Sequence, residues 1–376
     1  MNWPLTVIIA TCVQSVLVIQ LFIEDTARRF ALDEDWLGLL ASAETGMAAL
    51  ISLFVFLKPS MVSRSLLLFS GAMLFAGNAA CAFVQTPEQL LIARAVMGGS
   101  AGLICSWAYR EVLNSNDSAR AQGIALMLQS FLLVVSFAVV PHLAELIESP
   151  LYWVNGGWFL LMLVALFRVQ VSALQPVSSS TSQTSFAPLP ALLFFVGVVT
   201  MYASHGAFDT FIAELGSQSG VALTDIGYAM MAACAIGIPA GAMASAIGAR
   251  LGVLRPILVA VISMLAAMVV LALADMQVAI FWLVAVAYNF GWVLALPFIV
   301  LAAEALTDGG RMASGLLMMQ ALGMATGAII SGDLAADIGI NMALVGIVPV
   351  ALLLSVVAFA LLNRKVAVRV EIYPDG

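Results

Sequence analysis

The sequence predicts an all-α integral membrane protein with twelve transmembrane helices arranged as two six-helix bundles. Three observations support this fold class: the apolar composition, apolar runs long enough to span a bilayer, and a polar stretch that separates two sets of six runs. Of the 376 residues, 63% are hydrophobic and only 9% are charged, whereas a soluble domain carries about 25% charged residues. The mean hydropathy is +1.09. The lipid bilayer is therefore the expected surroundings of this chain.

Each predicted span is a run of about 20 apolar residues, the length that crosses the hydrocarbon core as a helix. The first run has no basic segment before it and no small-residue cleavage site after it, so it is predicted to be a retained span and not a signal peptide. In chain order the spans are 5–23, 36–57, 65–84, 88–109, 121–141, 151–169, 189–212, 226–247, 253–274, 277–303, 312–332 and 341–362.

Between the two sets of spans lies QVSALQPVSSSTSQTSFAP, residues 170–188. Its Ser/Thr-rich composition is typical of a flexible linker. An insertion of no consequence is the alternative, but the position between six and six spans favours a cytoplasmic linker. The predicted division is an N-terminal bundle at 1–169, this linker, a C-terminal bundle at 189–363 and a cytoplasmic tail at 364–376.

The basic residues predict the orientation in the membrane. With the N-terminus inside, eleven of the 14 basic residues fall on the cytoplasmic side, which satisfies the positive-inside rule. Both termini are then cytoplasmic, and the expected location of this multi-pass protein is the bacterial plasma (inner) membrane. The cytoplasmic basic residues are Lys58, Arg64, Arg110, Arg120, Arg168, Arg250, Arg255, Arg311, Arg364, Lys365 and Arg369.

The two halves resemble each other in sequence. ARAQGIALMLQS at 119–130 is similar to GRMASGLLMMQA at 310–321. Arg311 follows Arg120 by 191 residues, and Gln320 follows Gln129 by the same offset. A common offset favours an internal duplication of one six-span unit, as in many secondary transporters.

Two motifs connect this layout with a known family. ARAVMGGSAG at 93–102 matches an R-x-x-x-G-x-x-x-G pattern. GAMASAIGARLG at 241–252 is similar to G-x-x-x-D-R-x-G-R-R, with Ser245 in place of the acidic residue. With these motifs and the six-plus-six layout, the chain resembles a major facilitator superfamily transporter over nearly its whole length. The resemblance implies alternating access, with two bundles rocking about a central cavity lined by the first, fourth, seventh and tenth spans.

One pattern of the family is absent. Drug/proton antiporters of this superfamily carry G-x-x-x-G-P-x-x-G-G in the fifth span, and residues 123–141 lack it. The absence disfavours multidrug efflux, without excluding export, and favours uptake or metabolite transport.

Two charged residues lie inside predicted spans, where ionisable side chains are costly and usually functional. Arg94, in the fourth span, is a candidate for binding an anionic group of the substrate, with a purely structural role as the alternative. Glu44, in the second span, is a candidate for proton coupling. Its expected partner is either Arg94 or the polar face of the eleventh span.

The seventh span contributes His205 and Asp209, whose i, i+4 spacing places them on one helix face. An imidazole beside a carboxylate is suited to proton transfer, so both are candidates for proton coupling, although Asp209 could simply be solvated. The remaining candidates line the expected cavity and would orient a substrate through amide and aromatic groups. These substrate-binding candidates are Gln14, Tyr202, Tyr288, Asn289 and Trp292.

The predicted function is secondary active transport of a small organic solute, coupled to protons, most simply as a symporter. No nucleotide-binding motif and no clustered Cys or His motif is present in the sequence. We therefore expect no enzyme activity, no cofactor, no metal and no nucleic-acid partner, and we expect a monomer. An efflux antiporter and a transporter-like membrane sensor remain the alternatives.

Overall fold

The computed structural model describes residues 3–113, 118–169, 188–240, 243, 252–306 and 311–372. The predicted linker, except Pro188, and nearly all of the motif at 241–252 lie outside the described residues. The described part is helical throughout and contains no strand. Its helices are α1 (Trp3–Thr11), α2 (Gln14–Leu17), α3 (Ile19–Phe30), α4 (Glu34–Leu57), α5 (Arg64–Cys81), α6 (Pro87–Leu113), α7 (Ser118–Leu143), α8 (Pro150–Arg168), α9 (Pro188–Gln218), α10 (Leu223–Ala235), α12 (Leu254–Leu273), α13 (Val278–Leu306), α14 (Arg311–Ile338) and α15 (Ile340–Ile372), with a short 3-10 turn η1 (Pro59–Met61) after α4.

Eleven helical segments within the described residues are long and apolar enough to cross a membrane. They correspond in order to the second through twelfth predicted spans. The last helix, α15, continues to residue 372 and so includes most of the predicted tail at 364–376. An all-helical membrane protein is thus confirmed.

The region of the predicted first span, 5–23, is not one unbroken helix, because α1, α2 and α3 divide it. The backbone leaves helical geometry at Val13 (φ −113°, ψ 10°) and at Val18 (φ −104°, ψ 27°). Near the first break, the side chains of Thr11 and Gln14 donate to carbonyl oxygens one turn earlier, at 2.7 and 2.8 Å. Such side-chain bonds compete with the helical ladder and support an irregular backbone inside a protein.

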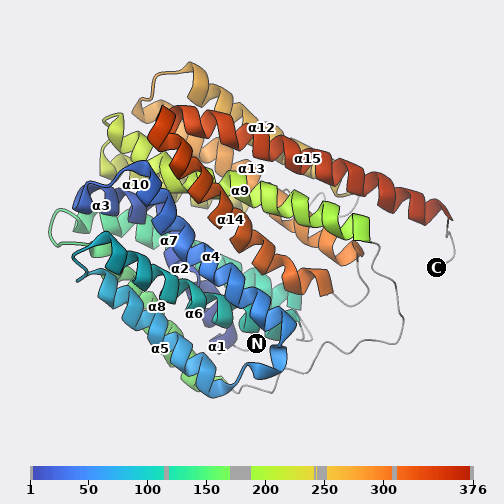
Figure 1. Cartoon of the computed structure of the whole chain (residues 1–376), viewed down its shortest axis with the longest axis horizontal. Helices are drawn as coiled ribbons and strands as arrows, with labels where there is room; N and C mark the ends of the chain where they lie inside the picture. Colours follow the sequence, from blue (N-terminus) through green and yellow to red (C-terminus); the bar gives the residue numbers. More distant parts are fainter. Residues whose placement is uncertain are drawn as a thin grey trace.

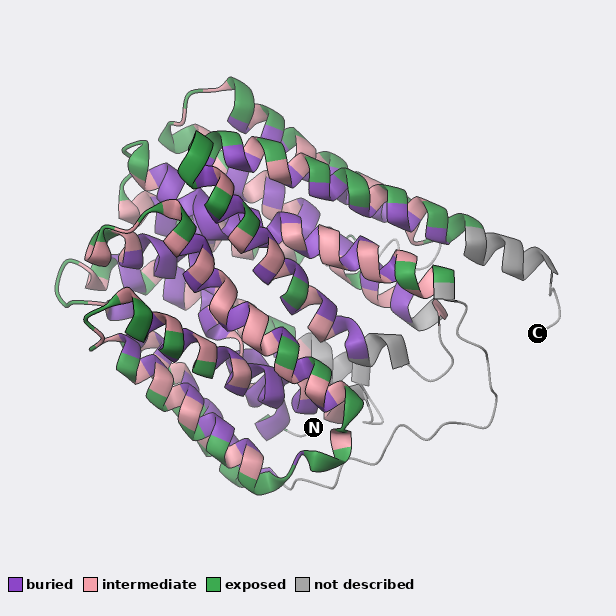
Figure 2. Ribbon diagram, viewed as in Figure 1, coloured by how far each residue is buried: buried purple, intermediate pink, exposed green. Residues whose placement is uncertain are grey.

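Figure 1 shows the helices running roughly parallel, with α1–α8 in the lower part and α9–α15 in the upper part. The two parts meet along α4 with α14, α7 with α10, and α3 with α9. Burial separates interior from peripheral helices (Figure 2). In the most apolar stretch of α6, 67% of the residues are buried, against 33% for α5. Helix α6 is therefore largely an interior helix, and its buried polar side chains, Arg94 and Ser100, face other helices.

Arg29 fastens α3 to the end of α5. Its guanidinium donates to the carbonyl oxygens of Cys81 at 2.9 Å and Ala82 at 3.4 Å, and it also contacts that of Val84. These carbonyls end a helix and have no intrahelical partner. The fork geometry of arginine allows one side chain to serve several of them.

We expect Arg29→Gln to lower the free energy of unfolding by about 1.5–3 kcal/mol, the range for hydrogen bonds to a charged group. Thermal and denaturant unfolding of the detergent-solubilised protein would measure this loss. Arg255→Gln, at an exposed position at the start of α12, is the control and should change stability little. Equal effects of the two substitutions would contradict a fastening role for Arg29.

Candidate functional site

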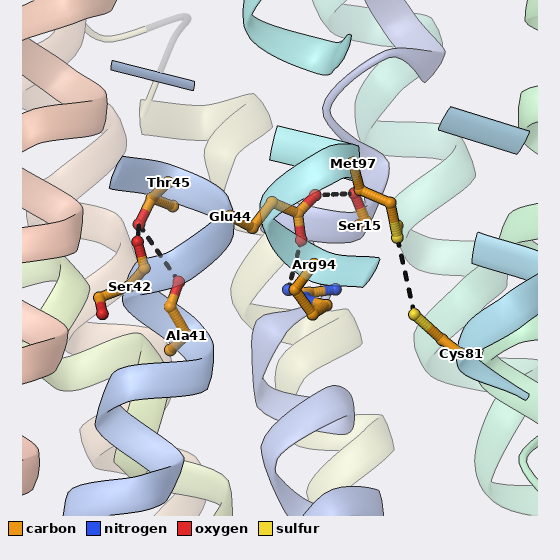
Figure 3. Close-up of polar contacts among 8 residues, drawn as sticks. All are labelled: Ser15, Ala41, Ser42, Glu44, Thr45, Cys81, Arg94 and Met97. Atoms are coloured by element: carbon orange, nitrogen blue, oxygen red, sulfur yellow. Dashed lines mark hydrogen bonds and ion pairs between the residues drawn. The ribbon is translucent and has the colours of Figure 1, made fainter. Parts of the chain in front are cut away.

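Glu44 and Arg94 form an ion pair in the interior of the α1–α8 half. Glu44 Oε2 lies 2.5 Å from Arg94 Nη2, and the two side chains are 0% and 2% exposed. The Ser15 hydroxyl donates to Glu44 Oε1 from the other side (Figure 3). The Phe22 ring covers the guanidinium, with its centroid 3.9 Å from Arg94 Cζ. Of the two partners expected for Glu44, the structure selects Arg94.

The spacing of Arg94 and Gly98 explains how this pair forms. The two residues lie one turn apart on the same face of α6. A Cβ at Gly98 would overlap the backbone carbonyl of Glu44, and a Cβ at Gly102 would lie 2.6 Å from the Ala48 oxygen. The glycines therefore let α6 approach the backbone of α4 closely, which places the guanidinium beside the carboxylate.

His205 and Asp209 form a second polar pair, on α9. Their Nε2 and Oδ2 atoms are 3.1 Å apart, and the side chains are 5% and 7% exposed. Asp209 is therefore buried and not solvated, although it lies in the last third of its helix. Neither His205 Nδ1 nor Asp209 Oδ1 has a hydrogen-bond partner.

Aromatic rings from α9 and α13 surround this second pair. The imidazole of His205 stacks on Trp292, with centroids 3.7 Å apart and planes at 15°. On another side it runs parallel to Tyr288 at 6.2 Å. Tyr202 meets Trp292 edge-on at 4.5 Å. With Asp209, five of the predicted residues are thus brought into one cluster.

Comparison with known proteins rests on structure. No protein-family model and no curated protein matches the sequence. The solved structure of the nucleoside transporter NupG superimposes with a TM-score of 0.71 at 13% identity, covering 96% of this chain and 99% of that one. A bacterial homologue of the human lysosomal transporter Spinster, inward-facing and occupied, gives 0.66 at 14% identity, covering 96% and 95%.

This chain has the major facilitator superfamily fold. At these identities the likeness establishes the fold, and both neighbours are transporters. The two polar pairs can therefore be placed within a major facilitator architecture. One pair belongs to the half formed by α1–α8 and the other to the half formed by α9–α15.

The segment α1–α3, where the sequence predicted the first span, contacts both pairs. Ser15 and Phe22 touch the Glu44–Arg94 pair, whereas the side chain of Gln20, between them in sequence, interacts with Asp209. Helix α3, which carries Gln20 and Phe22, packs along α9. The segment from α2 to α3 thus joins the two halves of the site.

The residues of the two pairs and of the segment that joins them lie at one depth of the fold. Gln20, Glu44, Asp209 and Tyr288 each lie about 15 Å along their helices from the end that carries the α3–α4 turn, and Arg94 lies about 10 Å from it. That end is at the left in Figure 1. The site is therefore a layer across the interior, and not two unrelated buried polar clusters.

Two substrate-binding candidates are engaged differently from expectation. The amide of Asn289 donates to the carbonyl of Ala285 on its own helix at 3.0 Å, so it is not brought to the cluster. Gln14 is fully buried, and its Nε2 donates to the Ala10 and Gln129 carbonyls at 2.8 and 3.3 Å. Its Oε1 remains without a partner.

Sequence reasoning missed several residues of the layer. Ser15, Gln20 and Phe22 sit in an apolar run and carry no motif. Ser204 accepts from the Tyr288 hydroxyl at 3.3 Å, and Phe208 stacks on the Tyr288 ring at 3.7 Å. A signal for the first two did exist, since Ser15 and Gln20 are polar side chains inside a predicted span.

Proposed function

We propose that this protein is a secondary active transporter that moves a small organic solute by alternating access, driven by protons. The observation that carries the proposal is the layer itself: two buried polar pairs, one in each half, joined through an interrupted first span. Ionisable groups inside a membrane protein mark substrate and proton pathways. The two neighbours, NupG and the Spinster homologue, are transporters of the same fold.

The arrangement in the membrane is part of the proposal. Counting α1–α3 as one interrupted span gives twelve spans in two six-helix bundles, at 1–169 and 189–363. Five described basic residues support cytoplasmic termini, because they all lie at the helix ends opposite the α3–α4 turn. A monomer in the bacterial inner membrane fits this arrangement. The five residues are Lys58, Arg64, Arg168, Arg255 and Arg364.

In this mechanism Glu44, His205 and Asp209 carry the proton. His205 faces Asp209 through Nε2, and its free Nδ1 gives a second position for the proton. A proton that binds to this pair, or to Glu44, changes the contacts of the first span, which reaches Glu44 through Ser15 and Asp209 through Gln20. Rearrangement of these contacts would link protonation to the rocking of the two halves.

The proposal predicts that His205→Gln uncouples transport from the proton gradient. For a symporter moving one proton per solute, a gradient of two pH units supports accumulation of up to about a hundredfold. His205→Gln should reduce the ratio of inside to outside solute to about one. Movement of the solute down its own concentration gradient should remain. Uptake into proteoliposomes, with and without a pH gradient, measures both quantities.

His142→Gln is the matched control. His142 is exposed and its ring nitrogen meets the Tyr228 hydroxyl at 2.8 Å, away from the polar layer. This variant should keep gradient-driven accumulation. Accumulation that ignores the gradient in the unmodified protein, or that survives in His205→Gln, would contradict proton coupling.

A further inference from the structure

The polar layer and the parts of the first span and α7 next to it contain hydrogen-bond acceptors that lack partners. Buried oxygen atoms without a donor are Oε1 of Gln14, Oε1 of Gln20, Oε1 of Gln129 and Oδ1 of Asp209, and Nδ1 of His205 is also unpaired. The Gln14 orientation is fixed by its amide nitrogen, which donates to two carbonyls. A buried acceptor without a donor is unfavourable, so such groups normally bond to water or to a ligand.

These atoms belong to the interrupted first span and to two helices that it contacts, α7 and α9. Gln14 and Gln20 belong to the interrupted first span, Gln129 to α7, and His205 and Asp209 to α9. Gln14 binds the backbone of Gln129, and Gln20 interacts with Asp209. The first span therefore presents acceptors on both sides of the joined layer.

Within the described part of the chain, no free positive charge balances them. Among the described residues Arg94 is the one buried arginine or lysine, and it is paired with Glu44 and covered by Phe22. The Nε of Arg94 has no hydrogen-bond partner either, but it is a donor and not an acceptor. The unpaired donor of Trp107 lies about 20 Å further along α6 than Arg94. An anion entering the layer would also meet the carboxylate of Asp209.

The molecular surface nearest the layer carries negative charge as well. Asp33 and Asp35 are exposed at the turn from α3 to α4, at the end of the molecule nearest the layer. Acidic groups on a protein surface lower the local concentration of anions. These charges favour a substrate without a negative charge over the anionic substrate group expected for Arg94.

We propose that the substrate is an uncharged solute with several hydroxyl or N–H donors and one apolar or aromatic face. The donors would satisfy the acceptors of the first span, α7 and α9. The apolar face would lie against the aromatic cluster of Tyr202, Tyr288 and Trp292, whose rings contain few polar atoms. This inference rests on the proposed transport function and specifies its substrate class.

Matched pairs of solutes test the charge requirement. Uptake into proteoliposomes would be measured for ribonucleosides and hexoses, and for their anionic counterparts, nucleoside 5′-monophosphates and hexonates. Saturable uptake is expected for at least one uncharged member, with its anionic counterpart competing at least about tenfold more weakly. Uptake of an anionic member, or equal competition, would overturn the inference, and so would a panel in which no uncharged member moves.

Failure of the substrate class can be distinguished from failure of transport. Spin labels on Asp35 in α4 and Asp337 in α14, both exposed, report the separation of the two halves at this end. Two populations of label distance support alternating access whatever the substrate is. A single fixed distance under all conditions, with no solute moving, would contradict the proposed function as well.

The acceptor on Gln20 supplies a second test. Gln20→Met keeps the length of the side chain and removes the amide oxygen. For the uncharged substrate we expect KM to rise about tenfold with kcat little changed, the effect of losing one hydrogen bond to the substrate. Gln277→Met, at an exposed position before α13, should leave KM unchanged. An unchanged KM in Gln20→Met would remove Gln20 from the binding surface.

Discussion

Arg94→Met is expected to lower the free energy of unfolding by about 3–5 kcal/mol, because it leaves the Glu44 carboxylate buried without its counter-ion. Glu44 is fully buried, and only the Ser15 hydroxyl would then remain beside it. Methionine has a length similar to that of the arginine stem, so the loss reports the charge more than the packing. Transport should be abolished in the same variant.

The double variant Glu44→Gln with Arg94→Met should recover most of the lost stability. It removes the unpaired charge, and replacing both members of a buried pair by neutral groups is often close to neutral in energy. Transport should nevertheless stay absent, because the titratable carboxyl and its partner are both gone. Denaturant unfolding in detergent and uptake into proteoliposomes would be measured for the two single variants and the double variant.

The double-mutant cycle can contradict the predicted coupling between Glu44 and Arg94 as well as confirm it. If the two single substitutions add without coupling, Glu44 and Arg94 do not depend on each other. Full transport in Arg94→Met would show that the ion pair takes no part in the transport cycle and has a purely structural role. Arg255→Met, at an exposed position, controls for the loss of a basic residue elsewhere in the chain.

The elements that the sequence predicted well have a strong local cause. A run of about 20 apolar residues has one stable conformation in lipid, so eleven of the predicted spans appear as helices in the described residues. The His205–Asp209 contact follows from i, i+4 spacing on one helix. Both predictions depend on neighbouring residues only.

The break in the first span could not be predicted, because no proline or glycine occurs from residue 5 to residue 23. The partner of Glu44 was equally ambiguous. Helix α4 packs against both α6 and α14, so two partners were sterically reasonable. The overlap of Gly98 with the Glu44 backbone decides between them, and it is a property of two helices and not of one.

The glycines at helix contacts predict two different outcomes for similar substitutions. A Cβ at Gly38 of α4 would lie 2.6 Å from the Ala328 oxygen and 2.9 Å from the Gly332 Cα, both on α14. This contact joins the two halves near the α3–α4 turn. Because the proposed cycle separates the halves here, Gly38→Val should shift the population toward the state open at this end, with moderate loss of stability.

Gly98→Val should instead destabilise the fold, by about 1–3 kcal/mol or more, as overpacking does. Its Cβ overlaps the Glu44 backbone within one half, and no step of the proposed cycle separates α4 from α6. Label distances between Asp35 and Asp337 should lengthen in Gly38→Val and stay unchanged in folded Gly98→Val. If both variants only lose stability and neither lengthens the distance, the halves do not part at this contact, and the layer beneath it has no opening on this side.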